Sequence, residues 1–120
     1  MGSVAAIVDR EKGTLVCDRC VVADNPIRRL KGLLGRRSLP AGEGLLLRPT
    51  GAVHTSFMRF PIDVVFLDDD LVVVHVVDEL RPWRAAARRG ARAVLELGAG
   101  ERVRRGIRRG DRLALVPAAA

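Results

Sequence analysis

The stretch His54-Thr-Ser-Phe-Met-Arg-Phe-Pro-Ile-Asp-Val-Val-Phe-Leu-Asp68 combines the pattern of two core strands with polar side chains that such strands rarely carry. Residues 62–67 are apolar except for Asp63, and residues 53–58 are typical of a second strand, separated from the first by a break at Pro61. Polar groups inside a core need hydrogen-bond partners or a functional role. This stretch therefore predicts both a β fold and the place of a site.

Alternation along a strand places His54 and Ser56 on one face of the strand predicted at 53–58. If the two strands are adjacent, these side chains converge with Asp63 at one end of the sheet. A histidine paired with a carboxylate has a fixed tautomer and a raised basicity, which suits a general base or a metal ligand. The structural alternative is that Asp63 accepts hydrogen bonds from free backbone N–H groups and His54 donates to a carbonyl. We assign Met58 to the core.

Outward from this stretch, short apolar segments alternate with turns rich in glycine, proline and aspartate. The segment Asp24–Gly35 predicts a helix, because it opens with capping residues and a proline and then repeats apolar residues at helical spacing. Residues 99–105 are expected to form one helical turn. Strands are predicted at residues 4–8, 14–22, 44–48, 53–58, 62–67, 71–77, 91–97 and 112–116.

These elements predict a mainly β protein, a small β-sandwich or jelly-roll-like barrel with one N-terminal helix. The strand at 71–77 is expected to be buried on both faces, because it is apolar almost throughout. The length of 120 residues favours a single domain over residues 1–117, with a tail at 118–120. There is no apolar run long enough to cross a bilayer and no signal-peptide pattern, so we expect a cytoplasmic protein.

The chain has 21 basic and 14 acidic residues, and 19 of the basic residues are arginine. Such a surface attracts polyanions at low salt without discriminating between sequences. Arg81, Arg84, Arg88 and Arg89 are the candidate anion-binding residues, and Trp83 among them could hold a planar anion. Aromatic residues make up only 3% of the chain, which weakens a single-stranded nucleic-acid interpretation. The alternative is a solvated basic surface without function.

Cys17-Asp-Arg-Cys20 is a single CxxC motif within a predicted strand. A structural zinc site needs four ligands, and a thioredoxin-like pair precedes a helix. Two inert thiols are therefore the main expectation, with a redox pair and a metal site as alternatives. His75 lies among valines, which is typical of a core histidine with a backbone partner. We predict no metal site and no cofactor.

Five motifs occur along the chain in the order found in one protein family. They are residues 29–36 (RLKGLLGR), 43–47 (EGLLL), 54–68, 93–100 (AVLELGAG) and 106–111 (GIRRGD). With these motifs the chain resembles the domain-of-unknown-function 192 family of small bacterial and archaeal proteins. The resemblance implies a mainly β, jelly-roll-like fold, and the central family pattern falls on His54, Met58, Pro61, Ile62 and Asp63. It implies no activity, since none is established for the family.

Three functional hypotheses follow from these residues. The first is a small binding module whose polar groove around His54 and Asp63, with Ser56 and Trp83, holds an unidentified small ligand. The second is a hydrolase-type enzyme with His54 as base and Asp63 as its orienting partner, although a nucleophile elbow and a full metal motif are missing. The third is a binder of nucleic acid or another polyanion through the arginine-rich surface.

Overall fold

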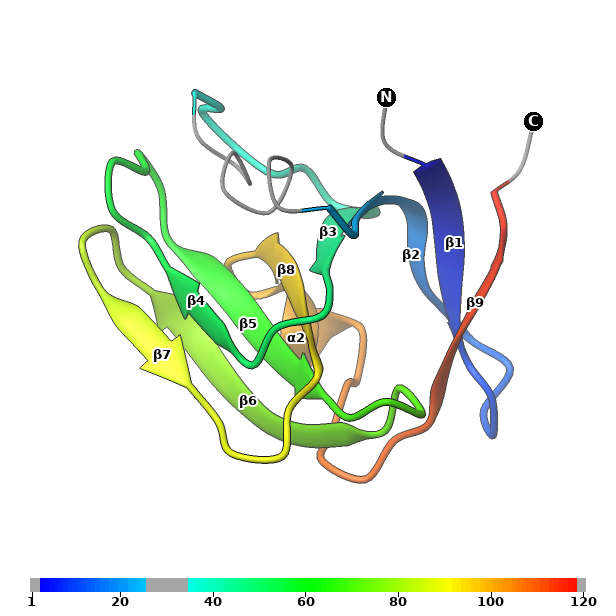
Figure 1. Cartoon of the computed structure of the whole chain (residues 1–120). Helices are drawn as coiled ribbons and strands as arrows, with labels where there is room; N and C mark the ends of the chain where they lie inside the picture. The colour runs from blue at the N-terminus through cyan, green and yellow to red at the C-terminus, as the bar shows by residue number, and fades with distance from the viewer. Residues whose placement is uncertain (1–2, 26–34, 119–120) are drawn as a thin grey trace.

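The computed structural model describes residues 3–25 and 35–118. Seven strands form one sheet in the order β6-β5-β8-β3-β2-β1-β9, and two further strands form the small sheet β4-β7 (Figure 1). Only β2 and β3 pair in parallel; the other pairs are antiparallel. The elements are β1 (Ser3–Asp9), β2 (Leu15–Ala23), β3 (Glu43–Leu47), β4 (Ala52–His54), β5 (Ile62–Leu67), β6 (Val73–Leu80), β7 (Ala85–Ala87), β8 (Ala93–Gly98), α2 (Glu101–Arg104) and β9 (Leu113–Pro117).

The prediction of a mainly β fold is confirmed, but the prediction of a barrel is wrong. The large sheet keeps two edges, β6 and β9, and a single bridge between Val72 and Arg112 links the chain beside them. The predicted N-terminal helix falls mainly on residues 26–34, outside the described residues. In the described part, the helix is α2, near the C-terminus, and no helix there is long and apolar enough to cross a membrane.

Strand β5 separates two hydrophobic clusters because its side chains alternate between the two faces of the sheet. Val65 and Leu67 point into one cluster, which we call the inner core. Strands from both ends of the sheet also contribute to it, through Val73 of β6 and Leu113 of β9. Val64 and Phe66 point into the outer core, which the small sheet β4-β7 covers through Val53 and Ala86. Met58 also lies in the outer core, as predicted. Every residue of β5 and of β8 is buried.

Two strands differ from the predicted ranges. The strand predicted at 53–58 ends at His54, because residues 55–58 form a turn that the Met58 N–H closes on the Thr55 carbonyl at 3.1 Å. Strand β6 runs over Val73–Leu80 and is half-exposed along most of its length, so the expectation of burial on both faces is wrong. Its position at the edge of the sheet explains the exposure. Strand β7 (Ala85–Ala87) lies between the strands predicted at 71–77 and 91–97, where a connection without a strand was expected.

The carboxyl group of Asp63 ties three elements together from a fully buried position. Ile62 pairs with Leu80 and Val64 with Val77, so β6 holds one more residue than β5 across this interval, which is a β-bulge. Asp63 Oδ1 accepts the N–H of the bulge residue Glu79, and Oδ2 accepts the N–H of Arg102 in α2, both at 2.9 Å. The helix has no side-chain cap of its own, so Asp63 supplies one from β5.

We expect Asp63→Asn to lower the free energy of unfolding by about 1–3 kcal/mol, because the amide would point an NH2 group at a buried backbone N–H. The corresponding loss in Tm is on the order of 5–10 °C. Urea and thermal unfolding measure both quantities. Asp69→Asn, in an exposed turn, is the matched control and should stay within about 0.5 kcal/mol of the wild type. A Tm for Asp63→Asn at or above that of the wild type would contradict a structural role.

Candidate functional site

Two turns meet at one corner of the molecule, one between β4 and β5 and the other between β6 and β7 (Figure 1). The fully buried Thr55 joins them. Its hydroxyl donates to the Arg81 carbonyl at 2.5 Å and accepts the Arg84 N–H at 2.9 Å. Its own N–H donates to the Arg84 carbonyl, and its carbonyl accepts the N–H groups of Met58 and Trp83. One threonine therefore links the two turns through hydrogen bonds to Met58, Arg81, Trp83 and Arg84.

Phe57 and Trp83 stand at the tips of these turns, and we call them the aromatic pair. Both have left-handed backbone conformations, with φ of 66° and 63°, at turn positions where glycine is the usual residue. A bulky residue in this conformation costs on the order of 1–3 kcal/mol. The side chains are nevertheless 71% and 58% exposed, and their ring centroids are 4.6 Å apart. Since little of this area is buried, core packing does not explain the strained placement.

Three of the four predicted ligand-binding residues lie at this corner. His54 ends β4 as an exposed residue paired with Ala85 of β7, Ser56 lies inside the first turn, and Trp83 is at the tip of the second. Asp63 is not with them. It pairs with Leu97, an inner-core residue, whereas the small sheet that ends at His54 covers the outer core.

The prediction of a shared groove around His54 and Asp63 is therefore wrong, because the two side chains lie on opposite faces of the large sheet. The same geometry removes the hydrolase arrangement in which Asp63 would orient His54 as a base. The convergence of the two residues was predicted for the case in which their strands are neighbours. Strand β4 pairs with β7 instead.

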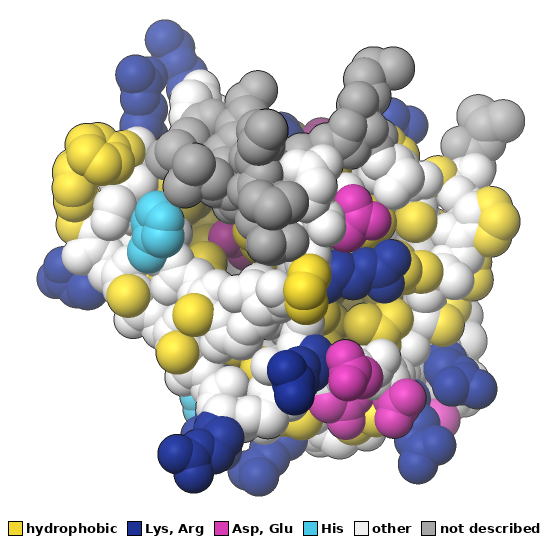
Figure 2. Space-filling model, viewed as in Figure 1, with side chains coloured by type: hydrophobic (Ala, Val, Ile, Leu, Met, Phe, Trp, Pro, Cys, Tyr) yellow, Lys and Arg dark blue, Asp and Glu magenta, His cyan; other side chains and the backbone are white. Residues whose placement is uncertain are grey.

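The chain around β4 and β7 carries a strong excess of positive charge. Residues 48–62 and 80–92, which we call the β4–β7 layer, contain seven arginines and no aspartate or glutamate. The remainder of the chain has fourteen basic and fourteen acidic residues. The four predicted anion-binding arginines belong to this layer and are exposed: Arg81, Arg84, Arg88 and Arg89. Figure 2 shows hydrophobic side chains gathered at the corner, a histidine beside them and basic side chains nearby.

Glu96 is a second unusual carboxyl group, on the outer-core side of the sheet. It lies in β8 between Leu45 and Val64, both outer-core residues, and its side chain is almost completely buried. Its Oε2 has no hydrogen-bond partner in the part of the chain that the structure describes. Burial raises the pKa of Glu96 to about 8, so the carboxyl group is mainly protonated at neutral pH.

The cysteines of the CxxC motif share one face of β2 because of a β-bulge. Ala5 pairs with Cys20 and Ile7 with Cys17, so β2 contains an extra residue, and the N–H groups of Asp18 and Arg19 both donate to the Gly42 carbonyl at 3.0 Å. Both thiols are free and buried in the inner core. The interaction between the two thiols lowers the pKa of Cys17 and raises that of Cys20.

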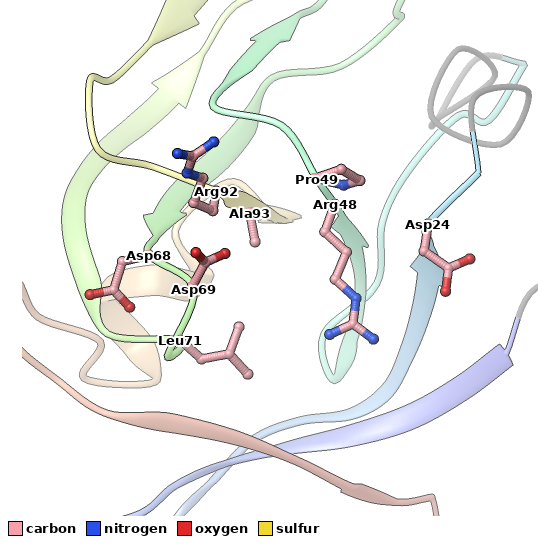
Figure 3. A pocket seen from close by; sticks show the side chains of 8 residues that line it. All are labelled: Asp24, Arg48, Pro49, Asp68, Asp69, Leu71, Arg92 and Ala93. Carbon is pink, nitrogen blue, oxygen red and sulfur yellow. The ribbon is translucent and has the colours of Figure 1, made fainter.

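A small cleft opens between β2 and the turn that joins β5 to β6 (Figure 3). Its volume is about 270 Å³, and Arg48 extends into it from the end of β3. Aspartates and arginines line it together, and Asp68 already accepts the N–H groups of Asp70 and Val72. Charges of both signs in one small space favour no particular class of ligand. The cleft is therefore a weaker candidate than the corner.

The remaining candidates do not add to a site. His75 is half-buried on β6, and its ring lies 5.9 Å from that of Phe66. Among residues 3–25 and 35–118, no three histidine, cysteine, aspartate or glutamate side chains are arranged to hold a metal ion.

Sequence reasoning did not single out Thr55, Phe57 or Glu96. An isolated acid in the apolar run at 93–97 was an available signal for Glu96, comparable to that for Asp63. Strand alternation places Phe57 with Val53 and Thr55 on the face opposite His54, and nothing local indicates the turn. Pro82 before Trp83 was a usable turn signal, since proline favours the position preceding a left-handed residue.

We expect Thr55→Val, which keeps the shape of the side chain, to lower the free energy of unfolding by about 1–3 kcal/mol. The variant leaves the Arg84 N–H and the Arg81 carbonyl without their buried partner. Urea unfolding measures the loss, and hydrogen exchange should show reduced protection of the Arg84 amide. Thr14→Val, at an exposed position, is the control. Equal stability and equal protection in the two variants would show that Thr55 does not hold the turns.

Glu96→Gln should change how stability depends on pH. The folded protein retains the Glu96 proton between about pH 4.5 and 8, while the unfolded chain loses it, so wild-type stability falls as pH rises through this window, by about 1.4 kcal/mol per pH unit from this group. Glutamine has no proton to lose. The stability of the variant relative to the wild type should therefore rise between about pH 5 and pH 8, as measured by urea unfolding. Glu79→Gln, at an exposed position, should show no such trend, and parallel profiles for Glu96→Gln and the wild type would refute the assignment.

Comparisons with known proteins agree with the motifs. The sequence model of the family DUF192, described as Uncharacterized ACR, matches residues 7–115. A UPF0127 protein of Pyrococcus abyssi is 31% identical over 117 residues, which cover 92% of this chain and 97% of that protein. A UPF0127 protein of Pyrococcus furiosus is 36% identical over 99 residues, covering 76% and 81%.

Two solved structures share the fold. A protein of Sinorhizobium meliloti, provisionally named a transcription regulator, superposes with a TM-score of 0.83 at 24% identity over 95% of each chain. A protein of unknown function from Novosphingobium aromaticivorans gives a TM-score of 0.78 at 22% identity, covering 94% of this chain and 84% of that one. The sequence relatives are archaeal and the structural neighbours bacterial, so these matches do not favour a bacterial source. With its match over nearly the whole length, the chain belongs to the uncharacterised DUF192 family.

Proposed function

We propose that this protein is a binding module whose β4–β7 layer attaches to an anionic partner. The aromatic pair would anchor the partner, and the surrounding arginines would supply the complementary charge. One observation carries the proposal: Phe57 and Trp83 are held in strained backbone conformations and yet are exposed. Strain of this kind persists where the surrounding structure enforces it and is concentrated at binding and switch regions.

The composition of the layer supports a binding role. Tryptophan and arginine are the residues that most often dominate binding energy at interfaces. Within the described part of the chain, no ion pair involves Arg59, Arg81, Arg84, Arg88 or Arg89. Their guanidinium groups therefore keep donors for carboxylates, phosphates or sulfates, although Arg84 Nη1 also donates to the Trp83 carbonyl.

A small-molecule site is a less suitable interpretation of the same corner. The surface between β4 and β7 is shallow and is lined by Ala52–His54 and Ala85–Ala87, most of which are alanine. Small-molecule sites are concave and combine apolar walls with several converging polar groups. Here His54 is the one strongly polar side chain in the lining. An extended anionic partner fits this surface better.

The test uses heparin as the anionic probe and the emission of Trp83, the only tryptophan, as the signal. We expect saturable binding at low ionic strength that weakens steeply as salt is added. Arg81→Gln/Arg84→Gln should bind several-fold more weakly. Arg108→Gln/Arg109→Gln, two exposed arginines outside the layer, is the matched control of equal charge loss.

Binding lost equally in both double variants would mean that only net charge matters, and the proposed site would be wrong. Failure of the wild type to bind heparin at low ionic strength would contradict an anionic partner altogether.

A further inference from the structure

We propose that the anionic partner is a lipid surface, into which the corner with the aromatic pair inserts at the level of the headgroups. This inference rests on the proposed function and narrows it to one class of partner. Three features of the corner lead to it: its projecting shape, its backbone hydrogen bonding and the distribution of charge around it.

The shape of the corner is suited to insertion into a lipid surface. Phe57 and Trp83 are in contact on two turns, and the β4–β5 and β6–β7 connections that contain them extend beyond the small sheet (Figure 1). A projecting apolar tip can be covered by lipid without a complementary pocket. Their rings also contact each other at a tilt of 60°, which occupies part of each aromatic face. Stacking of nucleic-acid bases needs free aromatic faces, and so this arrangement favours lipid over a single strand.

Several backbone polar groups of the corner are already satisfied by Thr55. Thr55 bonds the N–H groups of Met58, Trp83 and Arg84 and the carbonyls of Arg81 and Arg84. Turns normally rely on water for several of these groups, and water is scarce among lipid chains. A buried threonine that takes the place of water at these groups lowers the cost of inserting the two turns at the level of the headgroups. This role also explains why one side chain is shared by both turns.

The charges around the tip match an acidic membrane. Tryptophan is enriched at membrane interfaces, where its apolar ring and its N–H group are both accommodated. Arg59, Arg81 and Arg84 flank the aromatic pair in sequence, and arginine stems can lie along apolar groups while the guanidinium reaches phosphate. The β4–β7 layer has no acidic residue to repel anionic lipids, and the rest of the chain is neutral by count. Attraction would therefore turn this corner toward the membrane.

The experiment compares vesicles of phosphatidylcholine with vesicles that also contain phosphatidylglycerol. With the second type, we expect cosedimentation of the protein, a blue shift of Trp83 emission and protection of Trp83 from acrylamide quenching. Phe57→Gly should weaken vesicle binding about tenfold while Tm stays equal or rises, because glycine relieves the strain at φ 66°. Val103→Ala, which trims an exposed apolar side chain on α2, is the control and should bind like the wild type.

Each contrary result has a distinct meaning. If heparin binds but acidic vesicles do not shift Trp83 emission, the lipid inference is wrong and the proposed function stands. If a single-stranded oligonucleotide binds more tightly than the vesicles and Phe57→Gly abolishes that binding, the partner is nucleic acid and the lipid inference is wrong. If neither heparin nor vesicles bind, both proposals fail.

Discussion

A carboxyl group taken out of water must have its oxygens hydrogen-bonded. Asp63 meets this constraint with two bonds that link β5 to β6 and to α2. Its two partners are the bulge residue Glu79 in β6 and the first turn of α2. A bulge bends its strand and leaves an N–H group without a ladder partner. Asp63 stabilises that bend, and immediately beyond it the chain leaves β6 at Leu80 for the turn that carries Trp83. A buried group on the inner-core side of the sheet thus helps to determine where the corner begins.

Thr55 has a comparable role at the corner itself, with a different chemical basis. Its hydroxyl is both donor and acceptor, so from the first turn it binds both the Arg81 carbonyl and the Arg84 N–H of the second turn. Glycines in these turns would have avoided the backbone strain, but they would have displayed no side chains. The combination of a rigid buried hydroxyl and two strained aromatic residues is hard to explain by stability alone. It is consistent with selection for a surface feature at some cost in free energy.

The regular parts of the fold could be predicted from local pattern, whereas the site could be predicted only in part. The strands at 62–67 and 91–97 were recognisable because their β-branched and apolar runs are bounded by turn residues. The left-handed conformation of Phe57 was not, because non-glycine residues rarely adopt it and the local sequence alternates like a strand. The surroundings of Asp63 depend on a bulge in a distant strand. The arginines at 81–92 were evident in the sequence. Their position next to residues 48–62 could not be predicted, because it depends on the pairing of β4 with β7.

The confinement of the net charge to one layer also affects how copies of the protein behave toward each other. The formal charge of the whole chain is +7, and the β4–β7 layer accounts for all of it. In free solution this layer is the source of the mutual repulsion that opposes self-association. Once an anionic surface neutralises the layer, what remains facing outward is a body with balanced charges. The electrostatic repulsion between bound copies would then be small. The protein could therefore cover the surface densely, even though free copies repel one another.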